Sequence, residues 1–537
     1  MGDSRTDALV ARMIAEARRG RLSRRGFMEG ALWSGLTVAG ASSLWGAKVM
    51  AAVPKPGGLY RFGSHDANTT DSFDPATTES VYMIQLSHAA RNYLTEIAAD
   101  GSVVGDAATG WEASDDASEW RFELARDMTF HSGKPFTAAD AVASLNYHRG
   151  DDTTSAAKAL LESVTDIRTD GDHAIVITLD GGNADLPYLL TDYHLVMLPA
   201  DEMGRIDWES GDGAGPYRIV SHEPGVATRL VRHDGYHRDG LAHFAEVQMI
   251  ALNDSNARQS ALMTGEVDAL SETDVRTVDL LAMNPAIKIV EVASGTHPTI
   301  PMHVDTAPFD NVDVRLALKY AIDREALVER ILFGRGSIGN DNPIAPGMPF
   351  HHPMPQRAYD PDRARHHLQR AGLDSLSVEL SASDAAFSGA VDTALLFRES
   401  AAAAGIDISV RREPADGYWS EVWLRNPFMV VSWGARPTPD VLFSLAYQQG
   451  AAWNESRWAN PRFNELLLEA RRELDETRRA AMYAEMQELV HDDGGTIVPF
   501  FRNRVNAMSA RVGTPEQISG NWEADGARSF QRWWFES

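Results

Sequence analysis

Residues 111–147 read WEASDDASEWRFELARDMTFHSGKPFTAADAVASLNY and carry the clearest local pattern in the chain. Trp120, Phe122 and Leu124 alternate with charged residues, as expected of a strand with one buried face. Residues 132–135, Ser-Gly-Lys-Pro, combine glycine and proline and predict a tight turn. The first half of the stretch is therefore expected to be a strand that ends in a turn.

A helix is expected directly after this turn. Thr137 stands three residues before Asp140, which is the spacing of a capping box. Ala141, Val142 and Leu145 then recur at helical spacing, so that one face of the helix is apolar. The whole stretch thus predicts a strand, a tight turn and a capped helix in succession.

Three further motifs follow downstream. Residues 213–217, Gly-Ala-Gly-Pro-Tyr, predict a turn entering a strand, because glycine permits a positive φ and proline presets the turn. Residues 258–267 predict a short helix that Gly265 ends before a strand. Residues 314–324, VRLALKYAIDR, predict an amphipathic helix with its aliphatic residues on one face.

The order of these motifs resembles the signature of one family, the extracytoplasmic solute-binding proteins of peptide and nickel ABC importers, called solute-binding family 5. The shared features are Trp111, FHSGKPFT at 130–137, DAV at 140–142, the turn at 213–217 and the two later helices. The resemblance covers nearly the whole chain after residue 52. It implies an α/β, two-lobed periplasmic binding protein fold of the large, cluster C type, with an extra inserted subdomain.

The resemblance also implies a discontinuous order of domains. The expected parts are a base lobe from 53–95, 201–305 and 499–537, an inserted subdomain at 96–200, and a second lobe at 306–498. Hinge strands are expected near 300–304 and 499–504. Closure about such a hinge would bury a solute and shift a pre-existing open–closed equilibrium. The expected partners are the permease of an ABC importer and its ATPase.

Length, net charge and the lack of cysteine exclude several classes of protein. A chain of 537 residues is too long for one compact core. The net charge is −26, and without residues 1–52 it is −30, from 42 basic and 72 acidic residues. Such a charge disfavours nucleic acid and anionic membranes and suits a monomer in solution. The absence of cysteine excludes disulfides, thiolate metal sites and a lipoprotein anchor.

The first 52 residues are predicted to be a twin-arginine signal peptide. Ser23-Arg24-Arg25-Gly26-Phe27 matches the export pattern, and the uncharged run 31–47 is short and weakly apolar for a membrane-spanning helix. A retained membrane anchor is the alternative. Transport by the twin-arginine export machinery implies that the protein folds before it crosses to the periplasm.

Other chemistries have weaker support. Residues 334–339 have the letters of a dinucleotide fingerprint, but they follow a predicted helix, so a flexible loop is expected. The pairs 351–352 and 366–367 are histidines without the spacing of a zinc-binding helix, so solvated histidines are expected. No metal or cofactor is therefore predicted. A non-enzymatic binding protein is the first hypothesis, and a periplasmic hydrolase on the same scaffold is the alternative.

Residues 428–440 are predicted to contribute the ligand site. Phe428–Trp433 is a continuous apolar run, typical of a strand covered on both faces, and a Gly- and Pro-rich loop follows it. In α/β lobes, ligands collect where strands end. The stretch resembles the family's Trp-x-Ala-Asp loop, whose aspartate receives the α-amino group of peptide ligands. Arg436 holds that position here, which reverses the charge.

Arg436 therefore has two interpretations. Either it pairs with a nearby carboxylate, or it clamps a carboxylate or phosphate of the solute. The second interpretation favours an anionic, opine-like or acidic conjugate over a free-amine dipeptide. Asp440, four residues on, is either a substitute partner for the ligand or the cap of a helix that begins near Leu442. Candidates for apolar or stacking walls are Trp433, Tyr418, Trp419 and Trp453.

Overall fold

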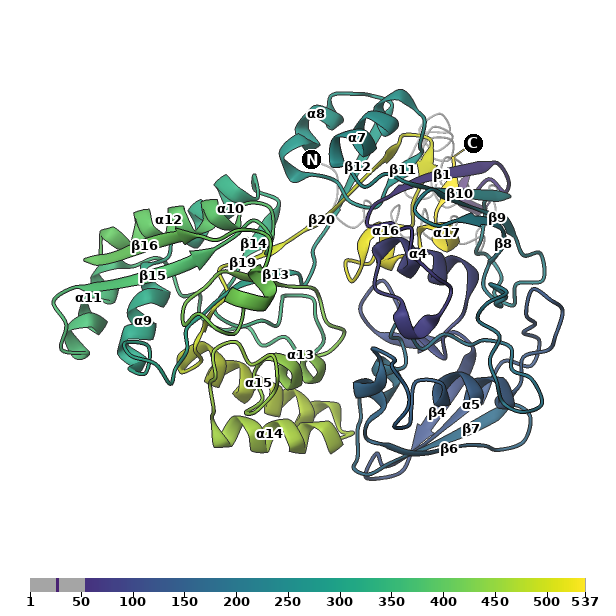
Figure 1. The fold of residues 1–537 in the computed structure, drawn as a ribbon, viewed down its shortest axis with the longest axis horizontal. Coiled ribbons are helices and arrows are strands. Elements are labelled where there is room, and N and C mark those ends of the chain that lie inside the picture. Colours follow the sequence, from purple (N-terminus) through teal and green to yellow (C-terminus); the bar gives the residue numbers. More distant parts are fainter. Residues whose placement is uncertain (1–25, 29–53, 537) are drawn as a thin grey trace.

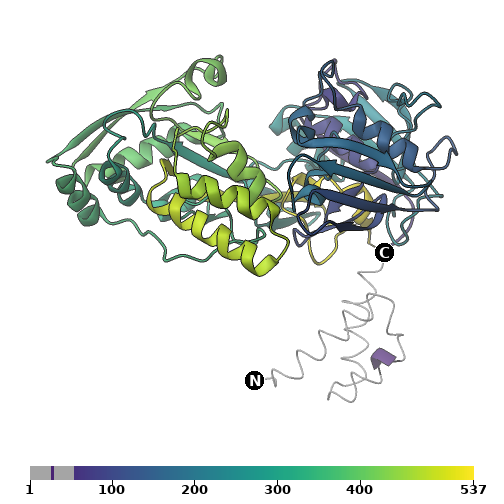
Figure 2. The same ribbon diagram turned by 90° about the horizontal axis from the view of Figure 1, so that it is seen from below.

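The structure is a computed structural model, and it describes residues 26–28 and 54–536. The predicted export signal, residues 1–52, lies outside the described residues apart from 26–28. Within the described ranges, no helix is both long and apolar enough to cross a membrane. Two lobes lie side by side and are joined by extended segments (Figures 1 and 2). The two-lobed α/β fold expected from the sequence is confirmed.

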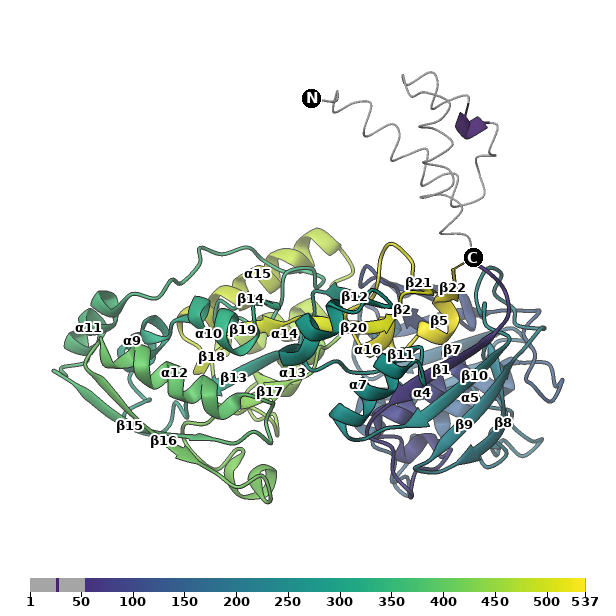
Figure 3. The same ribbon diagram turned by 90° about the horizontal axis from the view of Figure 1, so that it is seen from above.

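A seven-stranded sheet forms the core of the base lobe (Figure 3). Its central strand β1 is parallel to β10 and β11, whereas β8, β9, β12 and β20 pair antiparallel with their neighbours. The strands are β1 (Leu59–Ser64), β8 (Tyr217–Glu223), β9 (Ala227–Arg232), β10 (Glu246–Ala251), β11 (Ala269–Leu270), β12 (Ile287–Val292) and β20 (Arg504–Ser509). The helices of this lobe are α4 (Val81–Ala90), α7 (Ser255–Thr264), α8 (Val278–Ala282), α16 (Glu523–Gly526) and α17 (Ser529–Arg532).

The inserted subdomain contains the stretch quoted first. Its antiparallel sheet has the order β4-β5-β7-β6. The bounds are β4 (Ala108–Ala113), β5 (Glu119–Leu124), β6 (Val164–Thr169), β7 (Ala174–Leu179) and α5 (Ala138–Asn146), with β2 (Thr95–Ile97), β3 (Val103–Gly105) and α6 (Leu186–Leu189) beside them. The predicted strand and the capping box of Thr137 and Asp140 are confirmed.

His131 joins the motif at 130–137 to the turn at 213–217, where Gly215 lies 84 positions away in the sequence. Its backbone N–H donates to the carbonyl of Gly213 at 2.7 Å, and its Nε2 lies 2.9 Å from the carbonyl oxygen of Gly215. A Cβ atom at Gly215 would lie 2.4 Å from the carbonyl carbon of Ala90, so this turn requires glycine. The contact fixes the inserted subdomain against the base lobe.

The second lobe combines short sheets with seven α-helices. The strands are β13 (His297–Pro301), β14 (Gly336–Ile338), β15 (Leu376–Ala382), β16 (Ile406–Arg412), β17 (Val431–Trp433), β18 (Thr496–Ile497) and β19 (Phe500–Arg502). The helices are α9 (Val312–Ala321), α10 (Arg324–Ile331), α11 (Pro361–Arg370), α12 (Ala390–Ala402), α13 (Pro439–Ala446), α14 (Pro461–Arg472) and α15 (Glu476–Asp492). In the run 428–433 every side chain except Ser432 is buried, which confirms a segment covered on both faces.

Two expectations for this lobe are wrong. Residues 334–339 are not a flexible loop, because β14 pairs antiparallel with β19, and a Cβ at Gly339 would lie 2.1 Å from the carbonyl oxygen of Val498. His367 is not solvated, because its Nδ1 lies 2.8 Å from the Asp313 carboxylate and its side chain is packed inside the lobe. Among the described residues no group of three or more histidine or acidic side chains is placed to hold a metal.

Two segments connect the lobes near the centre of Figure 1: residues 293–296, which lead into β13, and the start of β20, which follows β19 almost directly. The first crossing precedes the expected 300–304, because β13 already pairs with β17 and β18 of the second lobe. The second lobe thus begins at residue 297 and not at 306. The second crossing falls inside the expected range 499–504.

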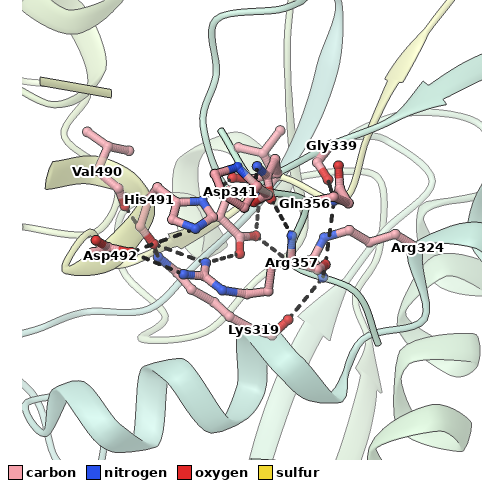
Figure 4. A network of polar contacts seen from close by, with 12 residues as sticks. Lys319, Arg324, Gly339, Asp341, Gln356, Arg357, Val490, His491 and Asp492 are labelled. Atoms are coloured by element: carbon pink, nitrogen blue, oxygen red, sulfur yellow. Dashed lines mark hydrogen bonds and ion pairs between the residues drawn. The ribbon is translucent and has the colours of Figure 1, made fainter. Parts of the chain in front are cut away.

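A buried ionic network holds the second lobe together (Figure 4). The carboxylate of Asp341 accepts from Arg324 and from Arg357, each at 2.6 Å. The Lys319 ammonium donates to the carbonyls of Val490 and His491. Burial works to raise the pKa of Asp341, but the three cations hold it well below its usual range. These groups join α9 and α10 to the end of α15.

Candidate functional site

The lobes enclose two cavities at their interface. The first has a volume of about 420 Å³ and is lined by three parts of the chain. These parts are the inserted subdomain (Tyr188, Asp192, Tyr193, His194), the second lobe (Ala435, Arg436, Pro437, Trp453) and the C-terminal segment (Asn521, Trp522, Arg528). A molecule in this cavity would touch both lobes at once.

The second cavity, of about 450 Å³, lies beside the hinge and is lined by equal numbers of arginines and carboxylates. Several of these charges pair within the cavity wall, such as Arg504 with Glu523 at 3.3 Å and Arg276 with Asp274 at 2.6 Å. Because its charges are balanced, this cavity has no clear preference for one kind of ligand. The first cavity is therefore the candidate site.

Arg436 is the distinctive group of the first cavity. Its guanidinium lies over the ring of Trp433, 5.6 Å from the centroid, and bonds only to the carbonyls of Gly434 and Ala435 at 3.4 and 3.3 Å. In the part of the chain that the structure describes, no carboxylate lies within 4.0 Å of it. Burial lowers the pKa of Arg436, against the fields of Tyr193 and Asp192. It stays charged at neutral pH, because guanidinium groups do not deprotonate in proteins.

The facing wall comes from the inserted subdomain and the C-terminal segment. The Asp192 carboxylate lies 2.6 Å from Nδ1 of His194, so its charge is engaged locally. The ring of Tyr193 meets Trp522 at 5.7 Å and 90°. Burial raises the pKa of Tyr193 to about 12, and Asp192 adds to this effect. Arg528 is neutralised by Glu96 at 2.6 Å, which leaves Arg436 as the cation available to a ligand.

The structure brings some of the predicted site residues together and separates others. Arg436 and Trp453 line the cavity, and Trp433 lies beneath Arg436. Tyr418 is buried behind the wall, where its hydroxyl donates to the carbonyl of Val430 at 2.6 Å. Trp419 is exposed and lies outside the cavity.

Asp440 has neither of its two expected roles. Thr438 caps α13, and its side chain accepts from the N–H of Val441. Asp440 lies in the first turn of α13, where it is buried and pairs with Nε of Arg471 at 3.2 Å. It does not line the cavity.

None of the predicted site residues belongs to the facing wall of the cavity. Tyr193, His194 and Trp522 carry no local signal, because they meet the loop at 434–438 only when the two lobes come together. Trp522 also lies in the last stretch of the chain, 86 residues after Arg436. Their place in the cavity wall depends on how the two lobes are arranged in space.

The lobes also contact each other at the rim far from the hinge, where α14 reaches the inserted subdomain (Figure 1). Arg479 of α15 pairs with Asp185 at 2.7 Å, and both side chains are buried. The N–H of Ala184 donates to the carbonyl of Arg471 at 2.7 Å. These contacts join the two lobes on the side opposite the hinge.

Comparison with known proteins gives a consistent result. The family model described as "Bacterial extracellular solute-binding proteins, family 5 Middle" matches residues 102–455. The chain is 24% identical over 490 residues to the glutathione-binding protein of Pectobacterium atrosepticum, covering 88% of this chain and 92% of that protein. It is 25% identical over 427 residues to heme-binding protein A of Haemophilus influenzae, covering 72% and 76%.

Solved structures share the fold. HbpA2 from Haemophilus parasuis superposes with a TM-score of 0.79 at 20% identity, covering 89% of this chain and all of that one. The periplasmic binding protein DppA from Helicobacter pylori, in complex with a peptide, superposes with a TM-score of 0.72 at 20% identity, covering 90% and 99%.

Proposed function

Since the chain belongs to family 5 of the bacterial extracellular solute-binding proteins, we propose that it is the periplasmic solute-binding component of an ABC importer. Its solute is a small anionic, peptide-like compound that the two lobes enclose and deliver to the membrane permease. The unpaired guanidinium of Arg436 in the interlobe cavity carries this proposal.

The argument from Arg436 is electrostatic. Removing a guanidinium from water without a counter-ion is costly, so buried charges in proteins are normally paired. Arg436 is half-buried, lines the interlobe cavity and, among the described residues, has only weak bonds to its own loop. A carboxylate or phosphate of a solute would supply the missing partner through two parallel N–H···O bonds. This supports an anionic solute over a neutral or cationic dipeptide.

Capture follows from the position of the cavity. A solute that binds Arg436 of the second lobe and also touches Tyr193 of the inserted subdomain interacts best with the closed form. It therefore shifts the open–closed equilibrium toward closure by its differential affinity for the two forms. The closed form is then the state that a permease can recognise.

The test begins with the solute itself. Mass spectrometry of the ligand released from protein purified under native conditions should identify an anionic compound. Glutathione is the first compound to titrate, because a relative is named for binding it. Calorimetric titration of Arg436→Ala should then show binding weaker by about 1.5–3 kcal/mol, the range for a hydrogen bond to a charged group. That corresponds to roughly ten- to 150-fold.

Arg457→Ala is the matched control. Arg457 also lies in the second lobe but is exposed and pairs with Asp305 at 3.2 Å, outside the cavity. Its removal should leave affinity unchanged. Equal affinity of Arg436→Ala and wild type, or tight binding of cationic dipeptides by the wild type, would show the proposal to be wrong. Catalytic turnover of the bound compound would favour the hydrolase alternative.

Export by the twin-arginine machinery is proposed from residues 23–27, Ser-Arg-Arg-Gly-Phe. Replacing Arg24 and Arg25 together by lysine should leave the precursor in the cytoplasm, as measured by fractionation and immunoblotting. A normal periplasmic yield from the double variant would contradict this route.

A further inference from the structure

Four indoles form a row that leads out of the interlobe cavity along the second lobe. We call this the tryptophan row, and in order it consists of Trp433, Trp453, Trp423 and Trp419. Neighbouring ring centroids are 6.0, 6.0 and 5.7 Å apart, with interplanar angles of 63°, 52° and 82°. The rings are steeply inclined to one another, so the indoles meet edge to face and are not stacked in parallel.

The row connects the cavity with solvent. Its inner member, Trp433, is buried beneath the guanidinium of Arg436. Trp453 lines the cavity and is 41% exposed, whereas Trp419 at the outer end is 45% exposed and lies outside the cavity. A solute held at Arg436 therefore has an aromatic path along which its remaining part can extend.

A buried carboxylate holds the row in place. Glu455 accepts from Nε1 of Trp423 at 2.7 Å and from the hydroxyl of Thr299 at 2.8 Å. Within the described ranges, no basic side chain lies within 4.0 Å of this carboxylate, although it is almost fully buried. Burial raises the pKa of Glu455, against the N–H groups of Trp423 and Trp433 and the Thr299 hydroxyl.

A buried carboxylate such as that of Glu455 is an energetically unfavourable way to fill a packed position. A buried carboxylate without a cation is unfavourable unless its hydrogen bonds are satisfied, and an apolar side chain would pack at lower cost. Glu455 differs from an apolar side chain in that its hydrogen bond to the indole N–H fixes the orientation of the Trp423 ring. This indicates an arrangement of the indoles that packing alone does not require.

We propose that the tryptophan row is a second part of the binding site, which takes a flat aromatic or heteroaromatic group of the solute. This inference rests on the proposed function, since the anion of the same solute occupies Arg436. The ring lies against Trp453 and extends toward Trp423, and Glu455 is a positioning residue that acts through Trp423. The solute class is then an anionic conjugate that carries an aromatic ring.

The test uses two matched series of carboxylates, benzoyl- and acetyl-capped glycine, diglycine and triglycine. Both series offer the same anion to Arg436, and they differ only in the ring and in its distance from the carboxylate. Calorimetry should show that one benzoyl compound binds the wild type roughly tenfold more tightly than its acetyl counterpart. Its binding should also change the tryptophan fluorescence.

Trp453→Ala and Trp419→Ala provide a matched pair, because the same substitution is made at two similarly exposed indoles. Trp453→Ala should abolish the preference, so that the benzoyl and acetyl compounds bind this variant with affinities within about twofold of each other. Trp419→Ala should keep the preference, since Trp419 lies beyond the reach of these short probes. Equal effects of the two substitutions would overturn the inference.

Glu455→Gln and Glu455→Leu test the positioning role. Glutamine keeps a carbonyl acceptor for the Trp423 N–H and should retain the benzoyl preference, whereas leucine removes the acceptor and should lose it. Affinity for the acetyl compounds should stay unchanged in both variants. If the preference survives in Glu455→Leu, Glu455 does not position the row.

The two proposals fail in different ways. If acetyl compounds bind in an Arg436-dependent manner but no benzoyl compound binds more tightly, the inference is wrong and the anionic site stands. If Arg436→Ala binds the acetyl compounds as well as the wild type, the anionic site itself is wrong. The absence of a ring preference at every length, as expected if the exposed indoles contact another protein, also overturns the inference.

Discussion

At the scale of single residues, Glu523 beside the hinge has an environment that links stability to pH. Its Oε1 lies 3.3 Å from Arg504, but its Oε2 has no hydrogen-bond partner and lies 3.8 Å from Nδ1 of His65. Burial raises the pKa of Glu523 to about 7, against the field of Arg504. The folded protein thus holds a proton here at pH values where the unfolded chain, with an ordinary value of 4.5, has released it.

A raised pKa favours folding at low pH. The contribution of Glu523 to the free energy of unfolding is complete below about pH 4.5 and is lost as the pH rises through about 7. Glu523→Gln cannot ionise, so its stability relative to wild type should increase by about 2–3 kcal/mol between pH 5 and pH 8. Urea unfolding at both pH values measures this. The exposed Glu266→Gln should show no such difference, and a pH-independent difference for Glu523→Gln would contradict the assignment.

The sequence could predict single residues only where the signal was local. The reversed charge at Arg436 was visible because it stands within a recognisable loop. The burial of Asp440 was not visible, because its partner Arg471 lies on a different helix, 31 residues away. Tyr193 and Trp522 could not be found at all, since their proximity depends on the arrangement of the lobes.

At the scale of elements, the network around Asp341 anchors α9 and α10, the helices of the motif at 314–324 (Figure 4). Asp341→Asn should lower the free energy of unfolding by about 3–5 kcal/mol, because the buried Arg324, Arg357 and Lys319 would lose their counter-ion. Guanidinium unfolding measures the change. Asp362→Asn removes an exposed carboxylate from α11 and should change stability by less than about 0.5 kcal/mol.

Two outcomes would contradict a stabilising role for the Asp341 network. A loss similar to that of Asp362→Asn would mean that the cations find other partners, such as the carbonyls they already contact. Asp341→Leu as stable as the wild type would show that the network contributes no net stability.

Elements were predicted well where capping residues stand beside an amphipathic pattern. The helix after Thr137 begins as its capping box predicts, since the two residues of the box lie three positions apart. Strand β14 was not predicted, because a three-residue strand is stabilised by its partner β19, which follows 164 residues later. Pairing at such separation leaves no periodic pattern in a short segment.

At the scale of the whole molecule, the motifs predicted two lobes but not where the chain passes between them. The first crossing lies at 293–296 because β13 pairs within the second lobe, and that pairing is invisible in the residues of β13 themselves. The contacts at the opposite rim were equally hidden. They join Asp185, in a polar loop of the inserted subdomain, to a helix nearly 300 residues later.

The ion pair between Asp185 and Arg479 should determine how stable the closed form is. Both side chains are buried in the closed arrangement, and the carboxylate of Asp185 has no partner other than Arg479 among the described residues. Opening must therefore separate two charges, and Asp185→Asn removes the counter-ion of the buried Arg479 when the lobes close, which leaves it only the Ala470 carbonyl and the Tyr483 hydroxyl as hydrogen-bond partners in the described part of the chain. Truncation of one member of such a pair costs about 2–5 kcal/mol.

We expect Asp185→Asn to bind solute at least about 30-fold more weakly, mainly through faster dissociation, because less of the protein is closed. Small-angle scattering should show a larger radius of gyration than wild type at the same solute concentration, with unchanged far-ultraviolet circular dichroism. Glu119→Gln, which breaks the exposed pair with Arg168 inside the inserted subdomain, serves as the control and should alter neither quantity. Asp185→Asn with Arg479→Gln should cost less than the sum of the single changes, since the two groups interact directly. Strict additivity would mean that the pair does not hold the lobes together.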